Sequence, residues 1–171
     1  MKGMLMHLFL FYLQTMNKET QSIIKNLENT LSGQPWFGRA VYEILEEVDE
    51  TKIHTKPNGT EHSLIELLWH MNTWAGFTLA NLENRASEEL KAIEENDWRI
   101  IDPAKHTWKS GLAELRSIHT KIAALLGQKD DSFLSNMVPN RKYNFRFMLN
   151  GLVQHNIYHL GQVAYLKKML A

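Results

Sequence analysis

Two histidines spaced four residues apart, His155 and His159, are the residues of this chain that point most directly to chemistry. They lie in a stretch from about Asn144 to Leu170 whose apolar residues recur with helical spacing. On a helix, the two imidazoles lie about 40° apart around the axis and roughly 6 Å apart along it, on the face that a globular helix buries. Burying two imidazoles without partners is costly, and one bound metal ion would satisfy both.

A third histidine occupies a similar position on another predicted helix. The stretch from about residue 60 or 63 to residue 84 places His70 in the middle of its inward face. Three neutral imidazoles from two facing helices make an open metal site, in which water or substrate takes the remaining position. We therefore predict that His70, His155 and His159 hold one divalent metal ion, and the alternative is that they are core histidines with protein partners. Imidazole suits zinc, nickel, iron and copper, so the ligand type does not name the ion.

Two further residues are weaker candidates for a catalytic role. His119 lies in the middle of the inward face of the third long helix, where it could be a fourth ligand, a proton shuttle or a core histidine. Glu66 lies one turn before His70 and could orient a ligand imidazole or act as a base. Its alternative role is a capping box with Ser63 at the start of the helix.

Other polar and aromatic residues flank the predicted ligands. Gln162 follows His159 by almost one helical turn and is placed to hydrogen-bond a ligand. Phe147, Tyr158 and Tyr165 form a stripe beside the main apolar face of the last helix. This stripe could serve a dimer or pack on a neighbouring helix, and the sequence does not decide between the two.

Several standard catalytic motifs are absent. Asn156 stands where a zinc protease keeps its general-base Glu, which excludes the HExxH mechanism. No Glu-x-x-His motif occurs, which excludes a di-iron bundle. No Gly-x-Ser-x-Gly elbow supports a Ser-His-Asp triad, although the sequence does not exclude that the fold brings such residues together. The chain contains no cysteine, so any metal must be held by His, Asp, Glu or water.

Composition indicates one compact domain. The chain has 171 residues, 44% of them hydrophobic, and its 19 basic residues balance 19 acidic ones without long charged blocks. This balance argues against nucleic acid or an anionic membrane surface as a partner. The first sixteen residues, MKGMLMHLFLFYLQTM, are short for a membrane span and lack a small-residue cleavage site.

Three interpretations of residues 1–16 stay open: a weak anchor or export signal, a mis-assigned start with translation from Met16, and an apolar extension. We expect a cytoplasmic protein whose domain spans residues 17–171. Periodicity and capping signals predict an all-α fold, a bundle of four long helices without strands. The expected helices span residues 17–31, 36–48, 60 or 63–84, 87–96, 102–127 and 144–170, with one helical turn near Phe133.

Three motifs in this order resemble the DinB-like (YfiT-type) metalloenzyme family. They are Gln154-His155-Asn156-Ile157-Tyr158-His159-Leu160-Gly161-Gln162-Val163, His62-Ser63-Leu64-Ile65-Glu66-Leu67-Leu68-Trp69-His70 and Pro35-Trp36-Phe37-Gly38. The resemblance implies a four-helix bundle in up-down-down-up order, often a homodimer, with a metal site at His70, His155 and His159.

The resemblance also implies a class of activity. Characterised members of the family include thiol S-transferases that use low-molecular-weight thiols such as bacillithiol, and a mycothiol-dependent isomerase. We therefore expect a metal-dependent thiol transferase acting on a small molecule, with zinc or nickel as the first choice of ion and iron or manganese as alternatives. The other candidates are a hydrolase that uses metal-activated water and a non-catalytic metal-binding or dimerising bundle.

Overall fold

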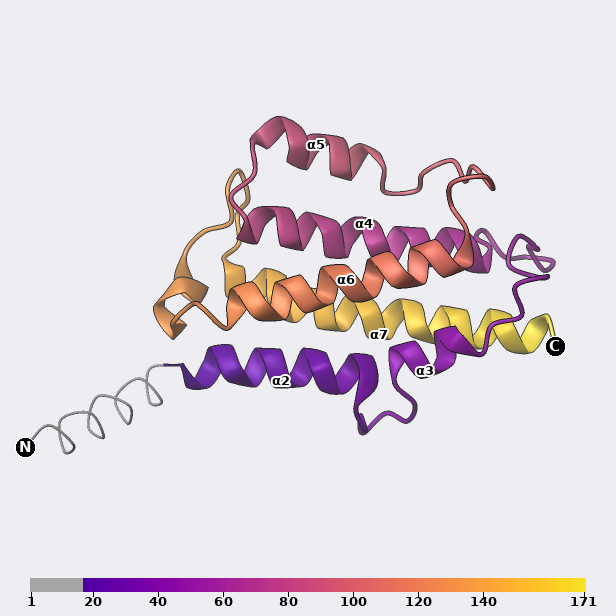
Figure 1. The fold of residues 1–171 in the computed structure, drawn as a ribbon, viewed down its shortest axis with the longest axis horizontal. Coiled ribbons are helices and arrows are strands. Elements are labelled where there is room, and N and C mark those ends of the chain that lie inside the picture. The colour runs from indigo at the N-terminus through magenta and orange to yellow at the C-terminus, as the bar shows by residue number, and fades with distance from the viewer. Residues whose placement is uncertain (1–16) are drawn as a thin grey trace, which may run out of the picture.

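The structure, a computed structural model, describes residues 17–171 and is all-helical over that range (Figure 1). The interpretations of residues 1–16 lie outside the described residues. The predicted all-α class is confirmed, because no strand occurs in residues 17–171 and only an isolated bridge joins Met137 to Asn144. The helices are α2 (Lys18–Ser32), α3 (Val41–Glu46), α4 (Leu64–Leu82), α5 (Ser87–Glu95), α6 (Trp108–Leu126), the 3-10 turn η1 (Asp131–Ser135) and α7 (Phe145–Met169).

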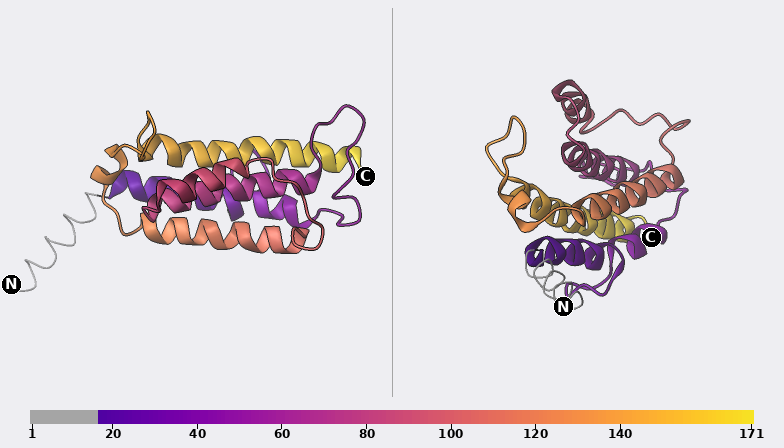
Figure 2. Two further views of the ribbon diagram at one scale, coloured as in Figure 1. Left: turned by 90° about the horizontal axis from the view of Figure 1, so that it is seen from above. Right: turned by 60° about the vertical axis from the view of Figure 1, so that its left-hand side comes forward.

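Four long helices, α2, α4, α6 and α7, lie side by side along the molecule, with α2 and α7 running one way and α4 and α6 the other (Figure 1). Helix α4 packs against α6 on one side and α7 on another, and α7 also contacts α2 and α3. The short helix α5 lies outside α4, away from α2 (Figure 2). No helix among the described ones is long and apolar enough to cross a membrane.

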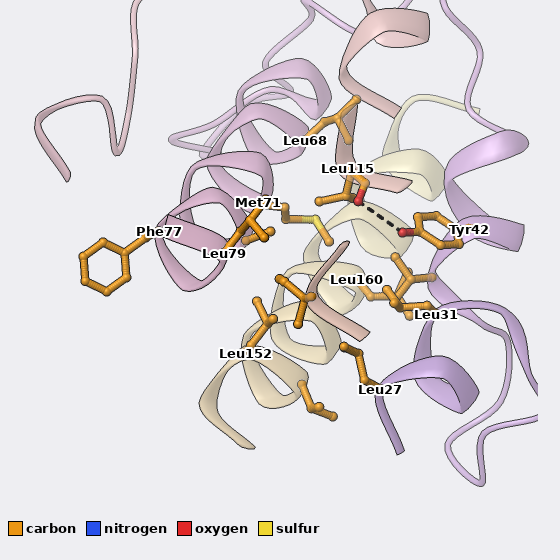
Figure 3. Packing of buried hydrophobic residues seen from close by; sticks show 14 of the residues in the cluster. Leu27, Leu31, Tyr42, Leu68, Met71, Phe77, Leu79, Leu115, Leu152 and Leu160 are labelled. Atoms are coloured by element: carbon orange, nitrogen blue, oxygen red, sulfur yellow. Dashed lines mark hydrogen bonds between the residues drawn. The ribbon is translucent and has the colours of Figure 1, made fainter. Parts of the chain in front are cut away.

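The core lies between these helices and is filled mainly by aliphatic side chains, with a few aromatic rings among them (Figure 3). Burial of this apolar surface is the main force that holds the helices together. Fully buried members include Leu45, Leu68, Met71, Leu115, Ile122, Leu134 and Val163. The histidine-bearing faces of α4 and α7 are part of this packed interior.

One helix begins later than the sequence predicted. A helix was expected from Asp102 and Pro103, but α6 begins at Trp108. Asp102 instead closes a local turn, in which its side chain accepts the Ala104 N–H at 3.0 Å and its carbonyl accepts the His106 N–H at 2.7 Å. Thr107 then caps α6 by accepting the Ser110 N–H at 3.1 Å, in a capping box.

The second predicted helix also begins later than expected. Helix α3 starts at Val41 and not at Trp36, whose side chain is exposed. A turn precedes the helix, in which the Gly38 N–H donates to the Pro35 carbonyl at 3.1 Å. Gly38 adopts φ 126°, a backbone conformation that favours glycine and cannot continue a helix.

Candidate metal centre

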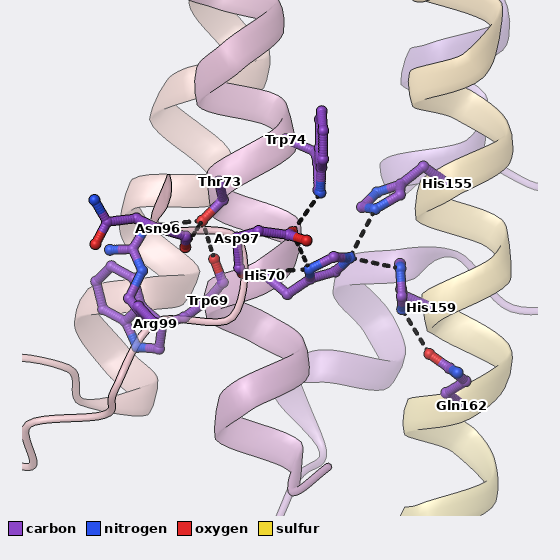
Figure 4. Close-up of polar contacts among 10 residues, drawn as sticks. All are labelled: Trp69, His70, Thr73, Trp74, Asn96, Asp97, Arg99, His155, His159 and Gln162. Atoms are coloured by element: carbon purple, nitrogen blue, oxygen red, sulfur yellow. Dashed lines mark hydrogen bonds and ion pairs between the residues drawn. The ribbon is translucent and has the colours of Figure 1, made fainter. Parts of the chain in front are cut away.

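Three histidine side chains converge between α4 and α7 (Figure 4). His70 Nε2 lies 2.9 Å from His159 Nε2 and 3.0 Å from His155 Nε2. The three residues each offer a ring nitrogen, and these nitrogens all lie within 4.8 Å of one another. His70 and His159 are buried and His155 is half-buried. We call His70, His155 and His159 the histidine cluster.

The opposite nitrogen of two of these rings has a defined partner. His70 Nδ1 lies 2.8 Å from Asp97 Oδ1, and Trp74 Nε1–H donates to the same oxygen at 2.7 Å. His159 Nδ1 lies 2.5 Å from Gln162 Oε1. Since carboxylate and amide oxygens only accept, both imidazoles donate from Nδ1 and carry a lone pair on Nε2.

This tautomer assignment tests whether the cluster fits a metal ion. Two lone-pair nitrogens of His70 and His159 face each other at 2.9 Å with no hydrogen between them, an arrangement that a shared cation stabilises. Ligand nitrogens of a tetrahedral zinc site lie about 3.3 Å apart when each bond is about 2.0–2.1 Å, so the observed spacing is close to that of a metal site. The donor set consists of three neutral imidazoles, and acceptors support the rings of His70 and His159. Such a set fits a divalent transition metal.

Electrostatics keep the cluster neutral. Burial, reinforced by the neighbouring imidazoles, lowers the pKa of His155 to about 3 and that of His159 to about 4. Burial also lowers the pKa of His70, although the Asp97 carboxylate opposes this shift. At neutral pH the three rings are therefore unprotonated and available as ligands.

The loop that follows α5 supplies residues that the sequence interpretation did not identify. Asp97 bonds to His70, and the Trp98 ring stacks on His70 at a centroid distance of 3.9 Å. Trp98 also stacks on His62 at 3.6 Å, so its ring lies between two imidazoles. Arg99 Nη2 donates to the Thr73 hydroxyl at 2.8 Å, which ties this loop to α4 (Figure 4).

Glu66 and His119, the weaker candidates, are not members of the cluster. The Glu66 carboxylate accepts the Ser63 N–H at 2.7 Å, as in the predicted capping box, and also bonds to Lys56 Nζ at 2.9 Å. His119 is buried in the core, where Asn156 Nδ2 donates to Nε2 at 3.1 Å and Nδ1 lies 3.0 Å from the Tyr42 hydroxyl. These contacts describe a helix cap and a hydrogen-bonded core histidine.

Two hollows differ in their relation to the cluster. The larger, about 840 Å³, lies between α2 and α6 and is lined by no member of the cluster. A smaller one, about 170 Å³, is lined by His155 together with residues of α4 and α7. The smaller hollow therefore borders the candidate metal centre at His155.

Comparison with models of protein families finds a match described as the DinB superfamily, over residues 37–163 of the 171-residue chain. The chain belongs to the DinB superfamily. A comparison with curated protein sequences finds no match. The part of the chain that matches the DinB superfamily includes the whole histidine cluster as well as Asp97 and Gln162. Membership and the cluster geometry are together compatible with a metal-binding enzyme.

Proposed function

We propose that this DinB-superfamily protein is a metal-dependent transferase that moves the sulfur of a low-molecular-weight thiol onto an electrophilic small molecule. The observation that carries the proposal is the convergence of three neutral imidazoles, two of which, His70 and His159, already have a partner at Nδ1. The chain has no cysteine, so the nucleophilic sulfur must come from a cosubstrate. The proposal assigns the four long helices to the up-down-down-up bundle that the family resemblance implies, and their directions in Figure 1 support it.

The side chains around the cluster have distinct tasks in this proposal. A divalent ion held by His70, His155 and His159 would act as a Lewis acid that lowers the pKa of a thiol or water. Asp97 and Gln162 fix the rings of His70 and His159 by accepting their Nδ1 hydrogens. Trp98 covers His70 and limits the access of water from that side.

The reaction balances without a redox partner. The thiol loses its proton to solvent, its sulfur forms a bond to the electrophilic carbon, and the leaving group departs with the electron pair of the broken bond. The choice of ion is zinc or nickel, because a three-imidazole site suits both, with iron and manganese as alternatives. We place the protein in the cytoplasm, where low-molecular-weight thiols are kept reduced, and propose that it is a homodimer.

The test is a thiol panel. Protein as purified is incubated with monochlorobimane and a series of low-molecular-weight thiols, and the fluorescent thioether is measured against a protein-free background. We expect acceleration with at least one thiol, and its loss in the double variant His155→Ala/His159→Ala. Background rates with every thiol would overturn the proposal, and hydrolysis of ester or amide substrates in the same samples would favour the metal-dependent hydrolase instead. A metal-loaded protein with neither activity would indicate the non-catalytic bundle.

A further inference from the structure

A small hollow between α4 and α7 opens beside the histidine cluster. Its volume is about 170 Å³. Trp74 and His155 lie on the same side of His70 and His159 (Figure 4), with ring centroids 6.3 Å apart. We call this hollow the aromatic pocket, and its walls include Trp74, Phe77, Tyr143, Phe147, Gly151 and His155.

The walls of the aromatic pocket present rings and few free polar groups. Trp74 and Phe77 meet edge to face with centroids 5.5 Å apart, and Tyr143 and Phe147 lie 5.3 Å apart. The Thr78 hydroxyl, which also lines the pocket, donates to the Trp74 carbonyl at 3.0 Å and is therefore satisfied. Such walls recognise an apolar group, above all one with an aromatic face.

The size of the pocket limits what it can hold. An engineered apolar cavity of about 150 Å³ in another protein binds benzene, so a hollow of this size suits a single ring. Gly151 keeps the space open, because a Cβ added there would meet nothing within 4 Å. A larger side chain at Gly151 would occupy the space that a ligand needs.

We propose that the aromatic pocket binds the apolar part of the electrophilic substrate, a group the size of one aromatic ring, and that it directs the reacting atom toward the histidine cluster. This inference rests on the proposed function for the identity of the reaction. The binding of a ring-sized group does not depend on that reaction and can be measured separately. His155 links the two, because its side chain belongs both to the pocket wall and to the cluster.

The binding test uses fluorobenzene as the probe and the full-length protein as purified. Titration followed by 19F NMR should give saturable binding to the wild type and at least tenfold weaker binding to Gly151→Leu. The matched control is Gly161→Leu on the same helix, where an added Cβ also meets nothing within 4 Å but the residue is exposed and outside the pocket. Binding of the control should stay within twofold of the wild type, and equal binding by all three proteins would overturn the proposal.

A second measurement needs no pocket variant. Met148 also lines the aromatic pocket, so its labelled methyl resonance, assigned with Met148→Leu, should shift as fluorobenzene is added. The methyl of Met137, which is exposed and outside the pocket, should not shift. A stationary Met148 methyl at saturating fluorobenzene would overturn the proposal even if Gly151→Leu failed to fold.

Kinetics separate failure of this inference from failure of the proposed function. With a thiol that is active in the panel, Gly151→Leu should raise the KM for benzyl bromide at least tenfold. The KM for iodoacetamide, which has no ring, should stay unchanged. If the wild type and Gly151→Leu both transfer the thiol and have equal KM values for benzyl bromide, the pocket assignment is overturned and the proposed function stands. Fluorobenzene binding at Met148 without any thiol transfer would support the pocket and overturn the proposed function.

Discussion

Asp97 is the residue that ties the loop after α5 to the histidine cluster. Its carboxylate accepts from both His70 Nδ1 and Trp74 Nε1, which fixes the orientation of the His70 ring. Conversion to asparagine keeps the shape and removes the charge. We expect Asp97→Asn to weaken zinc affinity by about 10- to 100-fold, the usual effect of losing such a partner, as measured by competition with a chromophoric chelator.

The control for this prediction is Glu95→Gln, which neutralises an exposed carboxylate two residues earlier in the chain. It should leave zinc affinity unchanged. Equal affinities for the wild type and Asp97→Asn, or equal losses in both variants, would show that Asp97 does not support the cluster.

His119 gives a prediction about pH. Burial lowers its pKa to about 4, from an ordinary value of 6.5. Between these values the unfolded chain binds a proton that the folded chain does not, so the free energy of unfolding falls as pH falls from 6.5 to 4. The full shift corresponds to roughly 3 kcal/mol. We expect the free energy of unfolding of metal-free protein, measured by urea denaturation, to change less with pH in His119→Gln than in the wild type, by about this amount. The control His54→Gln, at an exposed residue, should show the same pH dependence as the wild type. Parallel pH curves for the wild type and His119→Gln would contradict the assignment.

Among individual site residues, the sequence could predict those whose positions follow from helical periodicity. His70, His155 and His159 occupy inward positions of two helices, and the structure brings them together. Asp97 and Trp98 lie in a loop, where no periodic pattern relates a residue to the face of a distant helix. Only the three-dimensional path of that loop, tied to Thr73 by Arg99, brings them to His70.

Helix boundaries were predicted less well than the helices themselves. Asn144 is the predicted cap of α7, and Ser63, one of the two predicted starts of α4 beside Thr60, is the cap that the structure shows. Asp102-Pro103 carries a similar signal but forms a turn, and Thr107 caps α6. Asp102 and Thr107 are both residue types that cap helices, and the sequence alone does not show which of them precedes the first turn of α6.

The cap of α6 can be tested by substitution. Thr107→Ala removes the side chain that accepts the Ser110 N–H and should lower the free energy of unfolding by about 1 kcal/mol, as measured by urea denaturation. Asp102→Ala disturbs only a turn outside the helix and should cost less. A larger loss in Asp102→Ala than in Thr107→Ala would indicate that the helix begins at Asp102 in solution.

The exposed face of α7 concerns the assembly of the whole molecule. Phe147, Tyr158 and Tyr165 lie within about 20° of one another around the helix, and their exposures are 65%, 65% and 66%. Within residues 17–171 these three aromatic side chains stay largely exposed along one line of α7, and exposed apolar groups gathered on one face favour an interaction surface. This is the face through which we propose that the homodimer forms.

Light scattering after size-exclusion chromatography tests the homodimer. The wild type should have a mass near twice 19.9 kDa, and Tyr158→Glu should shift it toward a single chain. Met137→Glu places the same charge on an exposed apolar residue outside α7 and should leave the mass unchanged. A wild-type mass near 19.9 kDa would contradict the homodimer and leave the metal centre unaffected.

The metal content of the purified protein tests the whole account most directly. Full-length protein is prepared without added ions, and its metal content is measured by inductively coupled plasma mass spectrometry. The double variant His155→Ala/His159→Ala and the control His54→Ala, at an exposed residue, are measured in the same way, and circular dichroism confirms that each protein is folded. We predict close to one equivalent of a divalent transition metal in the wild type and the control, and less than about a tenth of that in the double variant, because two of three ligands are lost. Equal metal content in the folded wild type and the folded double variant would contradict the account.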